Sequence, residues 1–293
     1  MVKVTLEYCY NSKKEKKTMF KRVLSIVLCL CFMFSLCAFA EGVVGTYKVE
    51  PGIITNLLLS MTNQQFGIIM GPVLEDSLSF EFDAEGYVSG KLFIADINDF
   101  VFALEDASKT DYSAREISRT YWNEVDGSFY LISSIGGEYE TVGLSSGIED
   151  ESMTVIIEDS LPLRFNRCEG TSGYSGIWQL DMEYLKQLLA QMPLDQLLEG
   201  YTTNQILDAI STLDIYLYLK DDNSIGFSFV VCMGTYQDGT ITYAPELLEL
   251  VFSMQDISMT SSYSLEGDKI SVVNILTLND MTETLPIMLT AQN

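Results

Sequence analysis

The side chains that enzymes most often use for acid–base and nucleophilic chemistry are unevenly represented in this chain. Its 293 residues include 41 aspartates and glutamates but no histidine. The lack of histidine excludes Ser-His-Asp triads, Cys-His pairs and zinc sites built on imidazole. Segment 143–147 reads GLSSG, the spacing of a nucleophile elbow. That motif needs a strand, a tight turn, a helix and a histidine base, so we interpret the segment as a loop.

Carboxylates remain as candidate catalytic and metal-binding groups. Two of them could hydrolyse a glycosidic bond, but no spacing in the sequence distinguishes one pair from the others. Asp221, Asp222 and Asn223 offer oxygen ligands for calcium. Because the later glutamate of an EF-hand loop is missing, a hairpin turn explains them better. The sequence therefore predicts no catalytic residue, no metal site and no cofactor. A carboxylate-based hydrolase is the least favoured alternative.

The first 40 residues carry four of the six cysteines and have the composition of a targeting segment. Lysines and an arginine precede an apolar run over 23–40, which ends in Ala-Phe-Ala. This order predicts that residues 1–40 are a secretory signal peptide cleaved before Glu41. Met19 resembles an ordinary initiator, so residues 1–18 are interpreted as a stretch outside the natural translation product. The alternative is an uncleaved anchor, since 18 apolar residues can span a bilayer.

The chain after cleavage would be strongly acidic, with 10 Lys and Arg against 39 Asp and Glu, a net charge of −29. Such a surface repels phosphate backbones and anionic headgroups, which argues against nucleic acid and stable membrane insertion. We expect a protein that is secreted or associated with the cell envelope. Cys168 and Cys232 remain, and both a disulfide and two free thiols stay open as interpretations. The sequence gives no indication of oligomeric state.

Four phenylalanines are candidates for lining an apolar ligand cavity. They are Phe80, Phe82, Phe227 and Phe229. They lie in segments 78–94 and 214–231, where apolar residues alternate with polar ones on both sides of a polar turn. This period of two predicts antiparallel hairpins. Inward-facing phenylalanines either line a cavity or fill a core, and both alternatives are kept.

The elements that would position these phenylalanines occur twice and in the same order. Each series opens with a glycine, any residue and an aromatic residue on a short strand: Gly45 and Tyr47, then Gly176 and Trp178. An apolar helix with spacing i, i+3, i+4, i+7 follows, then the hairpin, and finally a strand containing Leu-Pro. Segments 123–131 and 263–273 also correspond, because both place an acid and a glycine before a strand.

This order predicts a duplicated, mostly β fold with a minor helical component. Residues 42–168 and 173–293 would form tandem antiparallel β-barrel domains, each with a helical insertion after its first strand. Closing such a series of strands into a barrel removes exposed edges. We expect 169–176 to be a short flexible link, and each half to bury its own core. The helical segment 181–211 would be either a lid or a plug of the second barrel.

The Gly-x-Trp of 176–178 resembles the motif that opens the first strand of lipocalins and related calycins, and Gly45-Thr46-Tyr47 is a weaker version of it. The order of strand, helices and hairpins is similar to that of bacterial lipocalin-like domains. The resemblance implies a structural role for both aromatic residues at the closed end of a barrel. It also implies a non-catalytic protein that binds a small apolar ligand or a protein partner. The alternative is an interaction module with filled barrels and an acidic surface.

Overall fold

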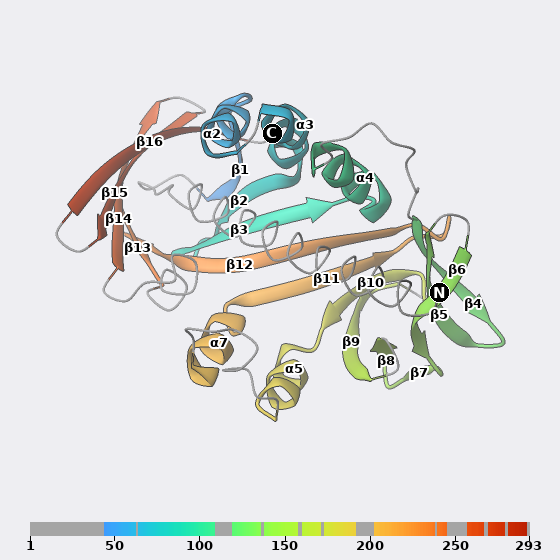
Figure 1. The fold of residues 1–293 in the computed structure, drawn as a ribbon. Helices are drawn as coiled ribbons and strands as arrows, with labels where there is room; N and C mark the ends of the chain where they lie inside the picture. Colours follow the sequence, from blue (N-terminus) through green and yellow to red (C-terminus); the bar gives the residue numbers. More distant parts are fainter. Residues whose placement is uncertain are drawn as a thin grey trace.

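The computed structural model describes eleven stretches of the chain. They are 44–62, 64–108, 119–135, 138–157, 160–170, 173–191, 202–237, 239–244, 257–266, 269–278 and 281–291. The predicted signal peptide and its cleavage site lie outside these stretches. The described residues form a mostly β fold with a smaller helical part (Figure 1), as the alternating pattern predicted. None of the helices within them has the length and apolar character needed to cross a membrane.

The first half of the chain contributes nine strands and three helices to the described fold. In order these are β1 (Gly45–Val49), α2 (Ile53–Met61), α3 (Gln64–Ser77), β2 (Leu78–Phe82), β3 (Tyr87–Ile94), α4 (Ile97–Ser108), β4 (Arg119–Val125), β5 (Ser128–Ile135), β6 (Glu138–Ser145), β7 (Ile148–Glu149), β8 (Ser152–Ile157) and β9 (Leu161–Glu169). The hairpin predicted over 78–94 is β2 and β3. Helices follow the first strand, as expected.

The second half repeats this beginning. Its described elements are β10 (Gly176–Leu180), α5 (Met182–Leu189), α7 (Thr203–Ile210), β11 (Leu213–Leu219), β12 (Ile225–Gln237), β13 (Thr240–Tyr243), β14 (Ile257–Glu266), β15 (Lys269–Leu278) and β16 (Met281–Ala291). Asp181 caps α5 by accepting a hydrogen bond from the backbone N–H of Tyr184. Thr202 and Gln205 form a reciprocal capping box at the start of α7. Such caps satisfy backbone N–H groups that lack a partner within the helix.

The sixteen strands of the described residues belong to one antiparallel sheet. Its order is β13-β14-β15-β16-β1-β2-β3-β12-β11-β10-β9-β8-β6-β5-β4, with β7 paired to β8. Besides the pairings of β16 with β1 and of β9 with β10, the halves meet where β3 pairs with β12, and Leu92 lies opposite Phe229 in that pairing. Figure 1 shows these two strands side by side in the middle of the molecule. The expectation that 42–168 and 173–293 form separate sheets is therefore wrong.

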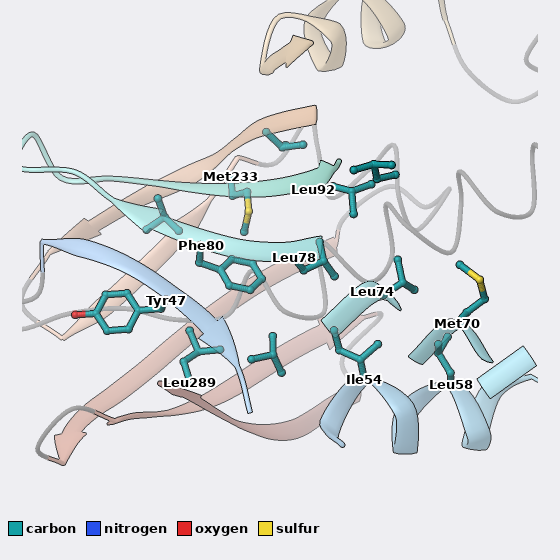
Figure 2. Close-up of a cluster of buried hydrophobic side chains, with 14 of the residues drawn as sticks. Tyr47, Ile54, Leu58, Met70, Leu74, Leu78, Phe80, Leu92, Met233 and Leu289 are labelled. Carbon is teal, nitrogen blue, oxygen red and sulfur yellow. The ribbon is translucent and has the colours of Figure 1, made fainter. Parts of the chain in front are cut away.

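Among the described residues the hydrophobic core forms two clusters, and both halves of the chain contribute to each. The first cluster joins α2, α3, α4 and β1–β3 to residues of β12, β13, β14 and β16 (Figure 2). The second joins residues of β4, β5, β8 and β9 to residues of β10, β11 and β12. The cause is that the last strands of the two halves are exchanged. The last strand of the second half, β16, pairs with the first strand of the first half, β1, and the last strand of the first half, β9, pairs with the first strand of the second half, β10. The expectation that each half buries its own core is wrong for this reason.

Corresponding strands of the two halves nevertheless have the same register. Tyr47 lies opposite Phe80 as Trp178 lies opposite Leu217. The Leu-Pro strands also match, because Val49 lies opposite Leu289 and Leu180 lies opposite Phe165. The neighbouring residues on each strand therefore face equivalent directions in both halves.

One predicted correspondence, between segments 123–131 and 263–273, is wrong. The hairpin of β4 and β5 pairs Val125 with Ser128 across its turn, and the equivalent tight turn in the second half pairs Gln237 with Thr240 between β12 and β13. The hairpin of β14 and β15 instead lies beside the Leu-Pro strand β16, as β7 and β8 lie beside β9. An acid followed by glycine is a general turn signal, so it did not distinguish one hairpin from another.

The backbone groups at the two ends of the sheet find hydrogen-bond partners in different ways. Strand β4 is at one end, where its backbone meets two asparagines instead of another strand. Asn98 accepts a hydrogen bond from the N–H of Thr120 (2.6 Å) and donates to its carbonyl (2.9 Å). The backbone carbonyl of Asn223 accepts from the N–H of Trp122 at 3.1 Å, and the side-chain amide of Asn223 donates to the Trp122 carbonyl at 2.9 Å. At the other end β13 pairs with both β14 and β12. Both arrangements occupy edge groups that another chain could otherwise pair with.

Candidate functional site

Phe80 and Phe82, two of the four predicted cavity residues, are packed inside the first cluster. They are 0% and 1% exposed. Gly90 makes room for this packing, because a Cβ atom there would lie 2.5 Å from the sulfur of Met233. Figure 2 shows Phe80 and Met233 pointing into the same cluster. Phe82 meets the rings of Tyr47 and Tyr236 edge-on, at centroid distances of 5.7 and 5.9 Å. These contacts are those of a filled core.

Phe227 and Phe229 lie on β12 and are only half-buried. Each has strands on both sides, with Leu217 and Ile94 flanking Phe227. Both rings pack against the first cluster from its margin. Their role in lining a cavity stays a prediction.

The aromatic residues of the two Gly-x-aromatic motifs are buried. Trp178 is 0% exposed, and Tyr47 is 7% exposed. The indole N–H of Trp178 donates to the carbonyl of Tyr174 at 2.7 Å. Gly176 has a φ of +138°, and a Cβ atom there would lie 2.2 Å from the carbonyl oxygen of Glu169. Only glycine permits this close approach of β9, so the motif serves the packing of β10 against its neighbour.

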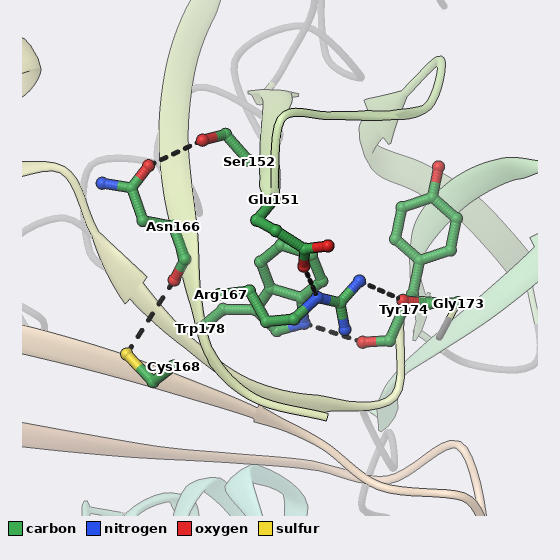
Figure 3. A network of polar contacts seen from close by, with 8 residues as sticks. All are labelled: Glu151, Ser152, Asn166, Arg167, Cys168, Gly173, Tyr174 and Trp178. Carbon is green, nitrogen blue, oxygen red and sulfur yellow. Dashed lines mark hydrogen bonds and ion pairs between the residues drawn. The ribbon is translucent and has the colours of Figure 1, made fainter. Parts of the chain in front are cut away.

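Arg167 covers the outer side of Trp178 and forms a polar network (Figure 3). Its guanidinium carbon lies 4.2 Å from the indole centroid, which is a cation–π contact. Its Nε bonds to Glu151 at 2.5 Å, and its Nη2 donates to the carbonyl of Gly173 at 2.7 Å. The side chain is 9% exposed, and Nη1 is buried without a hydrogen-bond partner among the described residues. The contacts hold the charge at the end of the second cluster.

The segment between the two halves is packed where the structure describes it. The Tyr174 ring is 2% exposed, and its hydroxyl donates to the carbonyl of Gly127 at 2.9 Å. Ser175 donates to a carboxylate oxygen of Asp221 at 2.5 Å. The glycine and serine content of 169–176 predicted a flexible link, and for residues 173–175 this prediction is wrong. A tyrosine in the segment provides the apolar area that anchors it.

Cys168 and Cys232 are both free thiols, the first exposed and the second half-buried. Burial raises the pKa of the Cys232 thiol, and the charges of Asp83 and Asp214 raise it further. Among the described residues no three Cys, Asp or Glu side chains gather as metal ligands. The turn residues Asp221, Asp222 and Asn223 lie at the β11–β12 hairpin, as predicted.

A pocket of about 270 Å³ lies over the faces of β1, β2 and β3 that point away from the first cluster. The buried Tyr47, Phe80 and Leu92 alternate on these strands with residues of the opposite face. The lining consists of two lysines, two acids, three hydroxyl side chains and one aromatic ring: Lys48, Lys91, Asp76, Glu81, Thr46, Ser77, Ser79 and Phe93. Of these residues, Phe93 is 40% exposed. The pocket is therefore polar, with an apolar end.

The strand registers place two lysines on either side of one serine in this pocket. On one side, Ser79 is opposite Lys91 of β3. On the other side is β1, where Tyr47 is opposite Phe80. The next residue of β1, Lys48, therefore lies beside Ser79. Lys48 donates to the backbone carbonyl of Asp76 at 2.8 Å. The Lys91 ammonium lies 5.9 Å from the centre of the Phe93 ring. Neither ammonium forms an ion pair with a carboxylate of the described chain.

No sequence pattern considered above predicted this pocket. The alternation of 78–94 was interpreted only for the inward face, where the phenylalanines are. The outward positions of the same segment, Ser79, Glu81 and Lys91, carry the signal that could have indicated it.

Comparison of the chain with protein-family models, with curated proteins and with solved structures finds no match. The lipocalin-like resemblance therefore rests on the Gly-x-aromatic motifs and on the order of the elements that follow them. Function has to be argued from the described geometry.

Proposed function

We propose that this protein is an exported, non-catalytic binding protein that recognises a small ligand on the outer face of its sheet and uses its interior for stability. One observation carries the proposal. Phe80 and Phe82, which would line an internal cavity, are fully buried in a packed cluster, whereas the pocket lies on the opposite face of the same strands. Polar groups that converge on a concave site are typical of ligand recognition.

The architecture that we propose is a duplicated lipocalin-like plan whose halves have exchanged strands. The pairings of β1, β2, β3, β12, β13, β14, β15 and β16 return to their starting strand, which supports a first barrel of eight strands. The remaining strands, with the beginning of β12, support a second barrel. In this second barrel Asn223, at the β11–β12 turn, forms hydrogen bonds to β4 at the place where a strand pairing would close the barrel. The equal registers of corresponding strands support the duplication.

A barrel of eight strands has an interior just wide enough for side chains to fill. This size agrees with the filled interior and with recognition at the surface. The acidic chain would avoid nucleic acid and anionic headgroups, and we propose no cofactor. Secretion or attachment to the envelope remains part of the proposal through the predicted signal peptide.

A second candidate function is the binding of a small apolar molecule between the two clusters. The observation that favours it is the partial exposure of Phe227 and Phe229 on the strand that both clusters share. In this case the ligand would contact β12, and the two phenylalanines would form its apolar wall.

Binding of cis-parinaric acid separates the two candidates, because its fluorescence rises when it enters an apolar cavity. We expect no saturable signal with the natural chain. The matched control is Phe80→Ala, since removal of a buried phenylalanine leaves a cavity that can take an apolar guest. A stoichiometric signal with the natural chain that Phe229→Ser abolishes would reject the surface proposal and establish the interior one.

A further inference from the structure

We infer that the pocket over β1, β2 and β3 binds a free α-amino acid, with its carboxylate between Lys48 and Lys91. This inference rests on the proposed function and names the ligand class of the surface site. Lys48 and Lys91 line the pocket from the strands on either side of Ser79, and neither ammonium is paired with a carboxylate of the described chain. An anion that reaches both would form charge-assisted hydrogen bonds.

The remaining lining indicates a ligand that also carries a positive charge. Glu81 lies on the same face of β2 as Ser79, two residues further along the strand. This separation is about 6.7 Å between backbone positions, because a strand rises about 3.3 Å per residue. A ligand with an anionic and a cationic end would therefore meet opposite charges in neighbouring rows of the sheet.

The spacing of the rows selects a short zwitterion. In an α-amino acid the ammonium nitrogen and the carboxylate carbon are about 2.5 Å apart, since they share one carbon atom. Hydrogen bonds of about 2.8 Å at each end extend this span to about 8 Å. In this arrangement the carboxylate of the ligand would meet Lys91, opposite Ser79, and its ammonium group would meet Glu81, two residues further along β2. In a dipeptide the charged ends are several ångströms further apart. When one end meets Lys91, the other end would lie beyond Glu81.

The pocket also has a place for an apolar side chain. Phe93 forms one wall, and its ring meets Tyr218 of β11 edge-on at a centroid distance of 5.2 Å. A volume of about 270 Å³ is small for a drug-sized molecule and suits an amino acid such as leucine. The side chain of the ligand would lie on the Phe93 side, and its ammonium group on the Glu81 side.

The experiment is an NMR titration of the full exported chain, uniformly labelled with ¹⁵N, with L-leucine as the probe. We expect saturable shifts of the Ser79 and Lys91 amide signals. L-leucinamide, which lacks the carboxylate, and N-acetyl-L-leucine, which lacks the ammonium group, should each bind about tenfold more weakly or worse. Lys91→Gln and Glu81→Gln should weaken L-leucine binding by a similar factor. Lys220→Gln, at the exposed β11–β12 turn, is the matched control and should leave the Kd unchanged.

Three results would overturn the inference. The first is the absence of saturable shifts at Ser79 and Lys91 up to about 10 mM L-leucine, a concentration about tenfold above a Kd of 1 mM. The second is equal binding of L-leucine and L-leucinamide, and the third is unchanged binding by Lys91→Gln. Unaltered thermal unfolding of each variant shows that the fold is intact. If cis-parinaric acid is excluded from the interior, these failures refute only the choice of ligand. Saturable parinaric acid binding refutes the proposed function itself.

Discussion

Replacement of Trp178 by alanine should be among the most destabilising single substitutions in this protein. The side chain is 0% exposed, and it is the largest fully buried side chain among the described residues. Deleting a buried Trp costs roughly 3–5 kcal/mol through lost transfer energy and the cavity left behind. The substitution also removes the indole hydrogen bond to Tyr174, worth about 1 kcal/mol. It further removes the aromatic face under Arg167, worth about 1 kcal/mol.

Because these contributions share one site, they are not strictly additive, and we expect a total near 5 kcal/mol. This is a large share of a typical unfolding free energy of about 5–15 kcal/mol. Trp178→Phe keeps an aromatic face and most of the volume, so it should cost about 2 kcal/mol. The assay is urea unfolding followed by far-UV circular dichroism, which does not depend on tryptophan emission. Tyr139→Ala is the control, since Tyr139 is 71% exposed. A loss for Trp178→Ala as small as the control's, about 0.5 kcal/mol or less, would refute the packing argument.

Three further predictions concern the edge, the thiols and the exchange of strands. Asn223→Ala removes the side-chain amide that donates to the Trp122 carbonyl, so it should free this acceptor at the edge of β4 and promote self-association, detectable by sedimentation velocity; Lys220→Ala on the same turn should stay like the natural chain. At pH 8 a thiol reagent should modify Cys168 at least several times faster than Cys232, because Cys232 is half-buried and its pKa is raised; equal rates would contradict the protection of Cys232. Residues 41–170 and 171–293, expressed separately, should be unfolded by circular dichroism and should regain structure when mixed, since both clusters need both pieces; a folded single piece would contradict the exchange.

The sequence predicted local structure well because local structure follows from local patterns. The period-two alternation around 83–86 and 220–224 correctly located two hairpins, since each strand must bury one face. The N-cap at Asp181 is equally local, because its side chain accepts from a backbone N–H in the next turn. The burial of Trp178 agrees with the structural role that the Gly-x-Trp resemblance implied, and Gly176 permits the close approach of Glu169 on β9.

The candidate site was predicted less well because it depends on register between strands. The spacing of Ser79 and Lys91 along the chain does not indicate that they are opposite each other; the length of the β2–β3 turn does. Lys48 joins them through the pairing of β1 with β2, across two helices of intervening sequence. The inward residues were recognisable because hydrophobic burial has a strong signature in one sequence. Outward polar residues have none until the strands are aligned.

The exchange of strands has a physical cause in the different lengths of equivalent segments. In the first half, β3 ends at Ile94, and helix α4 follows before β4 starts at Arg119. In the second half the chain continues straight through the equivalent point, and β12 is 13 residues long. At about 3.3 Å per residue this strand extends about 43 Å. It therefore begins beside the second cluster, where Ile225 is buried, and ends beside the first, where Met233 is buried. Strands that follow such a β12 have to complete the first cluster, and this leaves the second to β4–β9.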